Sequence, residues 1–90
     1  MKDDCYVIGL PSGERMEIMI RDGELWFDTK NLPPKDLAAL LQSDEEKVFD
    51  KEEKITYVRA SYYAKMWPEF QVIGNDLARK LKVKLPWPEN

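Results

Sequence analysis

Residues 18–29, with the sequence IMIRDGELWFDT, constrain the fold of this chain more than any other stretch. Two apolar runs flank Asp22 and Gly23, and an Asp-Gly pair favours a two-residue hairpin turn because both turn positions need positive φ. Such a turn also fixes which residues of the two strands face each other. It pairs Arg21 with Glu24, Ile20 with Leu25, Met19 with Trp26, and Ile18 with Phe27.

A second turn, expected at Ser12 and Gly13, extends the hairpin to a three-stranded antiparallel meander. With these two residues as the loop, Leu10 opposes Arg15, Val7 opposes Ile18, Tyr6 opposes Met19, and Cys5 opposes Ile20. Directly opposed residues share a face of the sheet. The predicted core face consists of Cys5, Val7, Met16, Ile18, Ile20, Leu25 and Phe27.

The other face is expected to carry Tyr6, Ile8, Glu17, Met19, Trp26 and Asp28. Tyr6, Met19 and Trp26 then form one row across three strands, which leaves two alternatives. Either the C-terminal helices cover the row, or the row is open and is itself a docking surface. A chain of 90 residues buries only about 60 to 65% of its unfolded surface, so the need for burial favours the covered sheet.

Helical patterns begin after Lys30. Pro34 suits a helix start, Asp36 suits a first turn, and leucines at helical spacing predict a helix over residues 34–42. Ser43 with Glu46 has the spacing of a capping box and predicts a second short helix through residues 48–49.

Residues 55–58, ITYV, indicate a further strand, and Ser61 is placed to cap a helix that stops before Pro68. Apolar residues at helical spacing predict a helix that ends near Leu81, followed by extended chain. A break at Gly74 and a strand over residues 80–85 are the alternatives. The expected fold is an α+β single domain spanning residues 1–90, a three-stranded antiparallel β-meander followed by short packed α-helices.

Composition narrows the function classes. The chain has no histidine and a single cysteine, Cys5, so it lacks the usual general base and cannot form an internal disulfide or a Cys/His metal site. The N-terminal residues resemble neither a signal peptide nor a membrane span. These features predict a non-enzymatic cytoplasmic protein without metal or cofactor.

Charge is divided unevenly along the chain. Residues 1–53 carry seven Lys/Arg against fourteen Asp/Glu, and residues 54–90 carry seven against three. Aromatic and basic residues interleave in the second half, as they do where rings stack on bases and cations meet phosphates. The candidate contacts with DNA or an acidic partner are Arg59, Tyr62, Lys65, Arg79, Lys80, Lys82 and Lys84.

Each candidate also has a structural alternative. Tyr63 and Trp67, four residues apart, would pack together in the core, and the lysines near residue 82 would line an exposed edge. The acidic run at residues 44–53 is either a docking segment for a basic partner or a solvated surface. Its charge argues against a helix-turn-helix recognition helix at this place.

The first half of the chain, GERMEIMIRDGELWFDTKNL…DLAALLQ, resembles the BRO-type N-terminal domain of phage antirepressors. Trp26-Phe27, Lys30, Leu37-Ala38 and Leu41 fall in matching places. The resemblance implies a phage or mobile-element regulatory module that binds DNA or a DNA-associated protein, here through its basic C-terminal half. The alternative is a small phage-type inhibitor that binds a host defence or transcription complex. The sequence leaves open whether the protein forms a homodimer.

Overall fold

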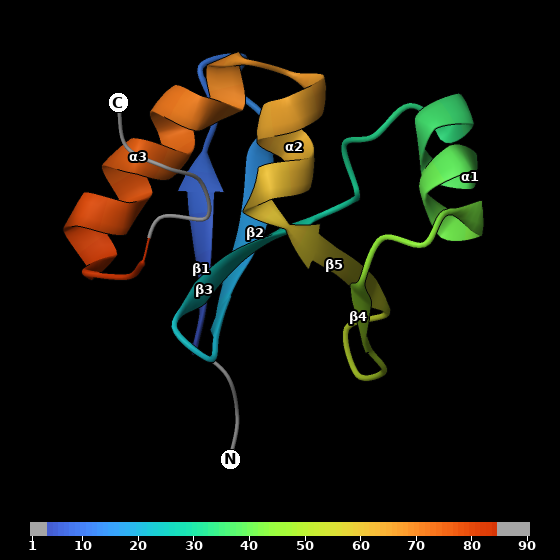
Figure 1. Ribbon diagram of the computed structural model, residues 1–90, viewed down its shortest axis with the longest axis horizontal. Helices are drawn as coiled ribbons and strands as arrows, with labels where there is room; N and C mark the ends of the chain where they lie inside the picture. The colour runs from blue at the N-terminus through green and yellow to red at the C-terminus, as the bar shows by residue number, and fades with distance from the viewer. Residues whose placement is uncertain (1–3, 85–90) are drawn as a thin grey trace.

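The computed structural model describes residues 4–84 and contains one five-stranded antiparallel sheet with three helices (Figure 1). The strands are β1 (Asp4–Gly9), β2 (Arg15–Arg21), β3 (Glu24–Asp28), β4 (Lys47–Asp50) and β5 (Ile55–Arg59), in the spatial order β1-β2-β3-β5-β4. The helices are α1 (Pro34–Gln42), α2 (Ala60–Met66) and α3 (Glu69–Leu81). The α+β class and the initial meander are confirmed, and β5 and β4 extend the sheet.

The β2–β3 hairpin has the predicted register. Asp22 and Gly23 adopt φ values of 52° and 75°, so both turn positions lie in the left-handed region that this tight hairpin requires. All four predicted pairs are present, from Arg21 with Glu24 to Ile18 with Phe27.

The register predicted for β1 is wrong by one residue. Gly13 donates its N–H to the carbonyl of Leu10 (2.9 Å), and Leu10 donates its own N–H to the carbonyl of Glu14 (2.8 Å). The loop therefore has three residues, 11–13, with Gly13 at φ 93°, which is typical of a turn followed by a bulge. Cys5 consequently pairs with Met19 rather than with Ile20.

A shift of one residue moves every side chain of a strand to the other face. Tyr6 and Ile8 lie opposite Ile18 and Met16, on the face predicted for Cys5 and Val7. The expected row of Tyr6, Met19 and Trp26 therefore does not form. The observed row across the second face consists of Cys5, Met19, Trp26 and Arg59.

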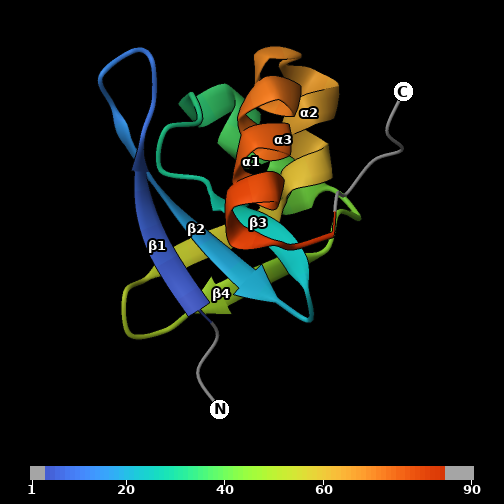
Figure 2. The same cartoon turned by 90° about the vertical axis from the view of Figure 1, so that its left-hand side faces the viewer.

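The helices pack on the first face of the sheet, and Figure 2 shows them gathered on one side of the strands. Buried side chains of β2, β3 and β5 meet those of α2 there, with Phe70, Leu77 and Leu81 of α3 packed against them. The buried members are Met16, Ile18, Leu25, Phe27, Leu32, Leu40, Val58, Ala60 and Tyr63.

The centre of the second face is buried as well, although Cys5 and Val7 of β1 are exposed, and the C-terminal helices do not cover it. Its core consists of Met19, Trp26, Ile55 and Tyr57, with Val48 against them, and every member belongs to a strand. The sheet is strongly twisted, so that β4 crosses the direction of β1 and β2 (Figure 2). The twisted sheet thus packs against itself and leaves Trp26 only 2% exposed.

Residues 47–50 form β4 and not the predicted second helix. The Ser43 hydroxyl donates to the carbonyl of Leu40 (2.7 Å) at the end of α1, so it serves the preceding helix. Glu46 binds Arg59 (Oε1 to Nη2, 2.8 Å) instead of closing a capping box. Val48 pairs with Tyr57 of β5 and thereby packs against the second core. This tertiary burial outweighs the local preference for a helix.

The remaining helices differ from prediction only at their ends. α2 begins at Ala60, directly after β5, so Ser61 lies inside the helix rather than at its cap. α3 runs without a break through Gly74 to Leu81, as predicted, and Lys82 ends it in the left-handed conformation (φ 56°). None of residues 80–84 is in a strand, so the alternative strand over residues 80–85 is wrong for them, and Leu85 lies outside the described residues.

In the part of the chain that the structure describes, no helix combines the length and apolar character that crossing a membrane requires.

Candidate functional site

Arg59, the first of the predicted contact residues, has three partners within the protein. Its guanidinium lies over the Trp26 ring, 4.7 Å from the ring centroid. It also forms ion pairs with Glu24 and Glu46. We call this arrangement the arginine clamp; it joins β3 and β5 to the segment that leads into β4.

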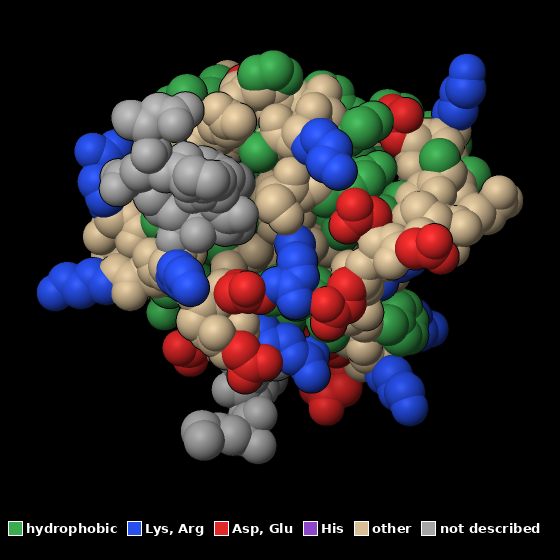
Figure 3. All heavy atoms as spheres, in the orientation of Figure 1, with side chains coloured by type: hydrophobic (Ala, Val, Ile, Leu, Met, Phe, Trp, Pro, Cys, Tyr) green, Lys and Arg blue, Asp and Glu red, His purple; other side chains and the backbone are tan. Residues whose placement is uncertain are grey.

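The other predicted contact residues do not form one surface. Lys65 is exposed near the end of α2, whereas Arg79, Lys82 and Lys84 are exposed at the far end of α3 (Figure 1). Lys80 pairs with Asp76 (2.9 Å). On the face in Figure 3, basic and acidic side chains alternate instead of gathering by sign.

Packing within the fold determines the positions of Tyr62 and of the predicted docking row, Tyr6, Met19 and Trp26. Tyr62 is half-buried and meets the ring of Tyr63 edge-on, with centroids 6.1 Å apart. Met19 and Trp26 are buried, while Tyr6 is exposed on the opposite face of the sheet. These last three residues therefore share no exposed surface.

A groove lies between the β1–β2 loop and the start of α3. It consists of two adjoining pockets, of about 320 and 420 Å³, that share Leu10, Ser12, Glu69 and Phe70. We call it the loop groove. The first pocket is also lined by Glu14, Met16, Asn31, Leu32, Pro33, Asp36, Tyr63 and Trp67, and the second by Pro11, Val72 and Ile73.

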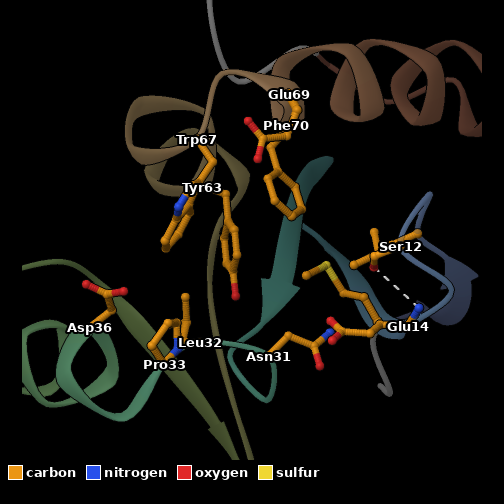
Figure 4. A pocket seen from close by; sticks show the side chains of 12 residues that line it. Ser12, Glu14, Asn31, Leu32, Pro33, Asp36, Tyr63, Trp67, Glu69 and Phe70 are labelled. Atoms are coloured by element: carbon orange, nitrogen blue, oxygen red, sulfur yellow. Dashed lines mark hydrogen bonds between the residues drawn. The ribbon is translucent and has the colours of Figure 1, made fainter.

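Three aromatic side chains of the α2–α3 corner face the first pocket. Figure 4 shows Tyr63 and Trp67 pointing toward Leu32 and Pro33, with the ring of Phe70 beside Tyr63. The Tyr63 centroid lies 4.8 Å from that of Phe70 and 5.5 Å from that of Trp67. The predicted packing of Tyr63 against Trp67 is confirmed, and Trp67 keeps part of its surface on the groove because it is only half-buried.

The depth at which these rings sit is set by one hydrogen bond. The Tyr63 hydroxyl donates to the carbonyl of Asp28 in β3 (2.6 Å). Burial raises the pKa of the Tyr63 phenol above its usual range, so the hydroxyl keeps its proton and remains a donor. The bond fixes α2 against the central strand and thereby positions Trp67 one turn later.

The Asp28 side chain forms hydrogen bonds with the backbone of β2 and of the segment that follows β3. Its carboxylate accepts N–H groups from Glu17 (2.6 Å) and Lys30 (3.0 Å), although the residue is fully buried. Burial raises the pKa of the Asp28 carboxyl, and the two N–H donors together with the charge of Lys30 oppose that rise. Asp28 thus holds the turn after β3, from which the chain passes to Leu32 and Pro33.

The charge of the groove has one sign. Glu14, Asp36 and Glu69 are among its lining residues, and none of the described residues that line either pocket is Lys or Arg. The whole chain carries 14 Lys and Arg, so their absence from this lining separates the groove from the mixed surface around it.

The sequence did not point to this groove. Its three carboxylates come from the β1–β2 loop, α1 and α3, and no local spacing connects them. The detectable signal is the spacing of Tyr63 and Trp67, four residues apart, for which the sequence offers core packing or a nucleic-acid site but no peptide groove.

Acidic residues elsewhere serve the fold. In the acidic run, Asp50 accepts the N–H groups of Glu52 and Glu53 (3.0 and 3.1 Å), and Glu46 belongs to the arginine clamp. Between residues 4 and 84, no group of three potential metal-ligating side chains is placed to hold an ion.

No family model, curated protein or solved structure matches this chain. The similarity to the BRO-type domain therefore stays a prediction, and the function is argued from the groove and the charges.

Proposed function

We propose that this protein is a non-enzymatic binding module that holds an apolar segment of another protein in the loop groove. The observation that carries the proposal is the exposed aromatic and aliphatic lining beside the β1–β2 loop. Val72 at its edge is 71% exposed, and Trp67 and Phe70 continue the same apolar surface inward. Contiguous apolar surface with a polar rim is typical of protein interaction sites.

The dimensions of the groove suit a short peptide segment. Each pocket has the volume of a small-ligand site, and their combined lining includes Pro33 in the first pocket and Ile73 of α3 in the second. Rigid aromatic side chains bind apolar partners at low entropic cost, and Tyr63 holds its neighbours in place through Asp28. The expected phage-type inhibitor of a host defence or transcription complex belongs to this function class, and that target stays a prediction.

A selection from a random peptide display library tests the proposal. Ser12 lines both pockets and is exposed, so Ser12→Tyr should obstruct the groove with little effect on folding. The same residue introduced at an exposed position outside the lining, Lys51→Tyr, is the matched control. We expect wild type and K51Y to enrich the same peptides and S12Y to lose them. Equal enrichment by S12Y, or none by wild type, would contradict the proposal.

DNA or a DNA-associated protein is the second candidate partner. The favouring observation is that Arg79, Lys82 and Lys84 are each exposed at or just after the end of α3, where the Lys84 N–H donates to the carbonyl of Gly23 (3.3 Å). Binding of a labelled duplex should weaken steeply with salt. Arg79→Gln should then reduce the slope of log affinity against log salt concentration by about one phosphate contact. An absence of binding at low salt would exclude duplex DNA.

A further inference from the structure

The arginine clamp shows how this protein holds a guanidinium group. The Arg59 guanidinium lies over the Trp26 ring, and carboxylates of Glu24 and Glu46 form ion pairs with its nitrogens. The combination is favourable because the ring face attracts the cation and the carboxylates accept its N–H donors. Arg59 remains about one third exposed, so the arrangement works at the protein surface.

The loop groove contains the same two kinds of partner without a cation. Trp67 lies between Asp36 and Glu69 in Figure 4, and all three line one pocket. Asp36 comes from α1 and Glu69 from the first turn of α3. The described lining supplies no Lys or Arg to neutralise them.

We infer that the loop groove recognises an arginine side chain within an apolar segment of a partner protein. The guanidinium would stack on Trp67 and pair with Asp36 and Glu69, while neighbouring apolar side chains contact Phe70 and Val72. This inference rests on the proposed function and adds the chemistry of the partner. Arginine is favoured over lysine because a planar guanidinium both stacks and donates several hydrogen bonds.

Charge excludes other occupants of this site. Three carboxylates, Glu14, Asp36 and Glu69, would repel the phosphates of a nucleic acid. An acidic or wholly apolar segment would leave the same carboxylates unpaired against its surface. A segment with one cation next to apolar residues would pair with the carboxylates of the groove and also cover its apolar lining.

The composition of the selected peptides is the first test. Peptides that wild type enriches and S12Y does not should share an arginine beside apolar residues. Groove-dependent peptides that lack arginine would leave the proposed function standing and overturn this inference. A failure of all groove-dependent enrichment would overturn both.

A second test uses a selected arginine peptide as the probe. Asp36→Asn with Glu69→Gln removes two charges while keeping shape, and Asp44→Asn with Glu52→Gln removes two exposed charges outside the groove. We expect the groove pair to lose about tenfold in affinity and the control pair to stay within about twofold. Equal losses for both pairs would contradict arginine pairing at this site.

Changes in the peptide complete the cycle. Replacing its arginine with alanine should abolish the difference between wild type and the D36N/E69Q protein. Replacing it with lysine should weaken binding to wild type, and equal binding would contradict stacking on Trp67. Light scattering of the protein alone gives a further outcome: a dimer that the peptide dissociates would make a second copy the occupant and overturn the inference.

Discussion

At the residue scale, the Tyr63 hydroxyl connects the helical layer to the sheet. Tyr63→Phe removes the hydrogen bond to Asp28 (2.6 Å) and keeps the ring. Because that bond is buried, we expect the free energy of unfolding to fall by about 1 to 2 kcal/mol, measured by urea denaturation. Tyr62→Phe is the control, since Tyr62 is only half-buried, and it should change stability by less than about 0.5 kcal/mol.

Asp28 makes stability depend on pH. Its pKa in the folded protein is raised from 3.8 by burial, so the folded state binds the proton more tightly than the unfolded state. Its favourable contribution is full below pH 3.8 and is lost as pH rises through the folded pKa. As pH rises over that interval, wild type should therefore lose unfolding free energy relative to Asp28→Asn.

Urea denaturation of both proteins at a series of pH values measures this difference. A difference that moves in favour of wild type as pH rises would contradict the account. It would mean that the N–H groups of Glu17 and Lys30 lower the pKa more than burial raises it.

At the element scale, the loop at residues 11–13 sets the register of β1. Gly13 has φ 93° and free space where a Cβ would lie, so Gly13→Ala adds backbone strain without a clash. We expect a loss of about 1 to 2 kcal/mol in unfolding free energy. Gly9→Ala is the matched control, because Gly9 also has free space but no positive φ. Equal losses for the two variants would argue against the strained loop.

These elements also show how far sequence reasoning reaches. The β2–β3 register was predictable because Asp22 and Gly23 determine it locally. The β1 register was not, because the pattern Pro-Ser-Gly fits both a two-residue loop and the observed three-residue loop. β4 was missed since its pairing with β5 joins residues such as Val48 and Tyr57 that no local signal connects.

The site was harder to predict than the fold. Basic residues were identified by type, but the structure engages Arg59 in the arginine clamp and Lys80 with Asp76. Trp26 is buried, as the need for burial favours, but strand residues and Arg59 cover it and the C-terminal helices do not. The loop groove depends on the relative placement of α1, the β1–β2 loop and α3, which only the tertiary structure provides.

At the scale of the whole molecule, the two cores share strands. Ile18 and Met19 are neighbours in β2 and face opposite cores, as do Phe27 and Trp26 in β3. Loss of either core should therefore disrupt the other, and unfolding should be one cooperative transition. Replacing both Trp67 and Trp87 with Phe leaves Trp26 as the single tryptophan of the sequence, so that its fluorescence reports on the second core, and circular dichroism follows the helices. Different midpoints from the two probes would contradict a single cooperative unit.

Two-dimensional NMR of the labelled protein with a selected peptide shows whether the loop groove is the binding surface. We predict that the largest shifts occur at the backbone amides of Ser12, Glu14, Glu69 and Phe70 and at the Trp67 indole N–H. The S12Y protein should show none of them. Largest shifts at Arg79, Lys82 and Lys84 would contradict the claim and place the binding surface at the end of α3.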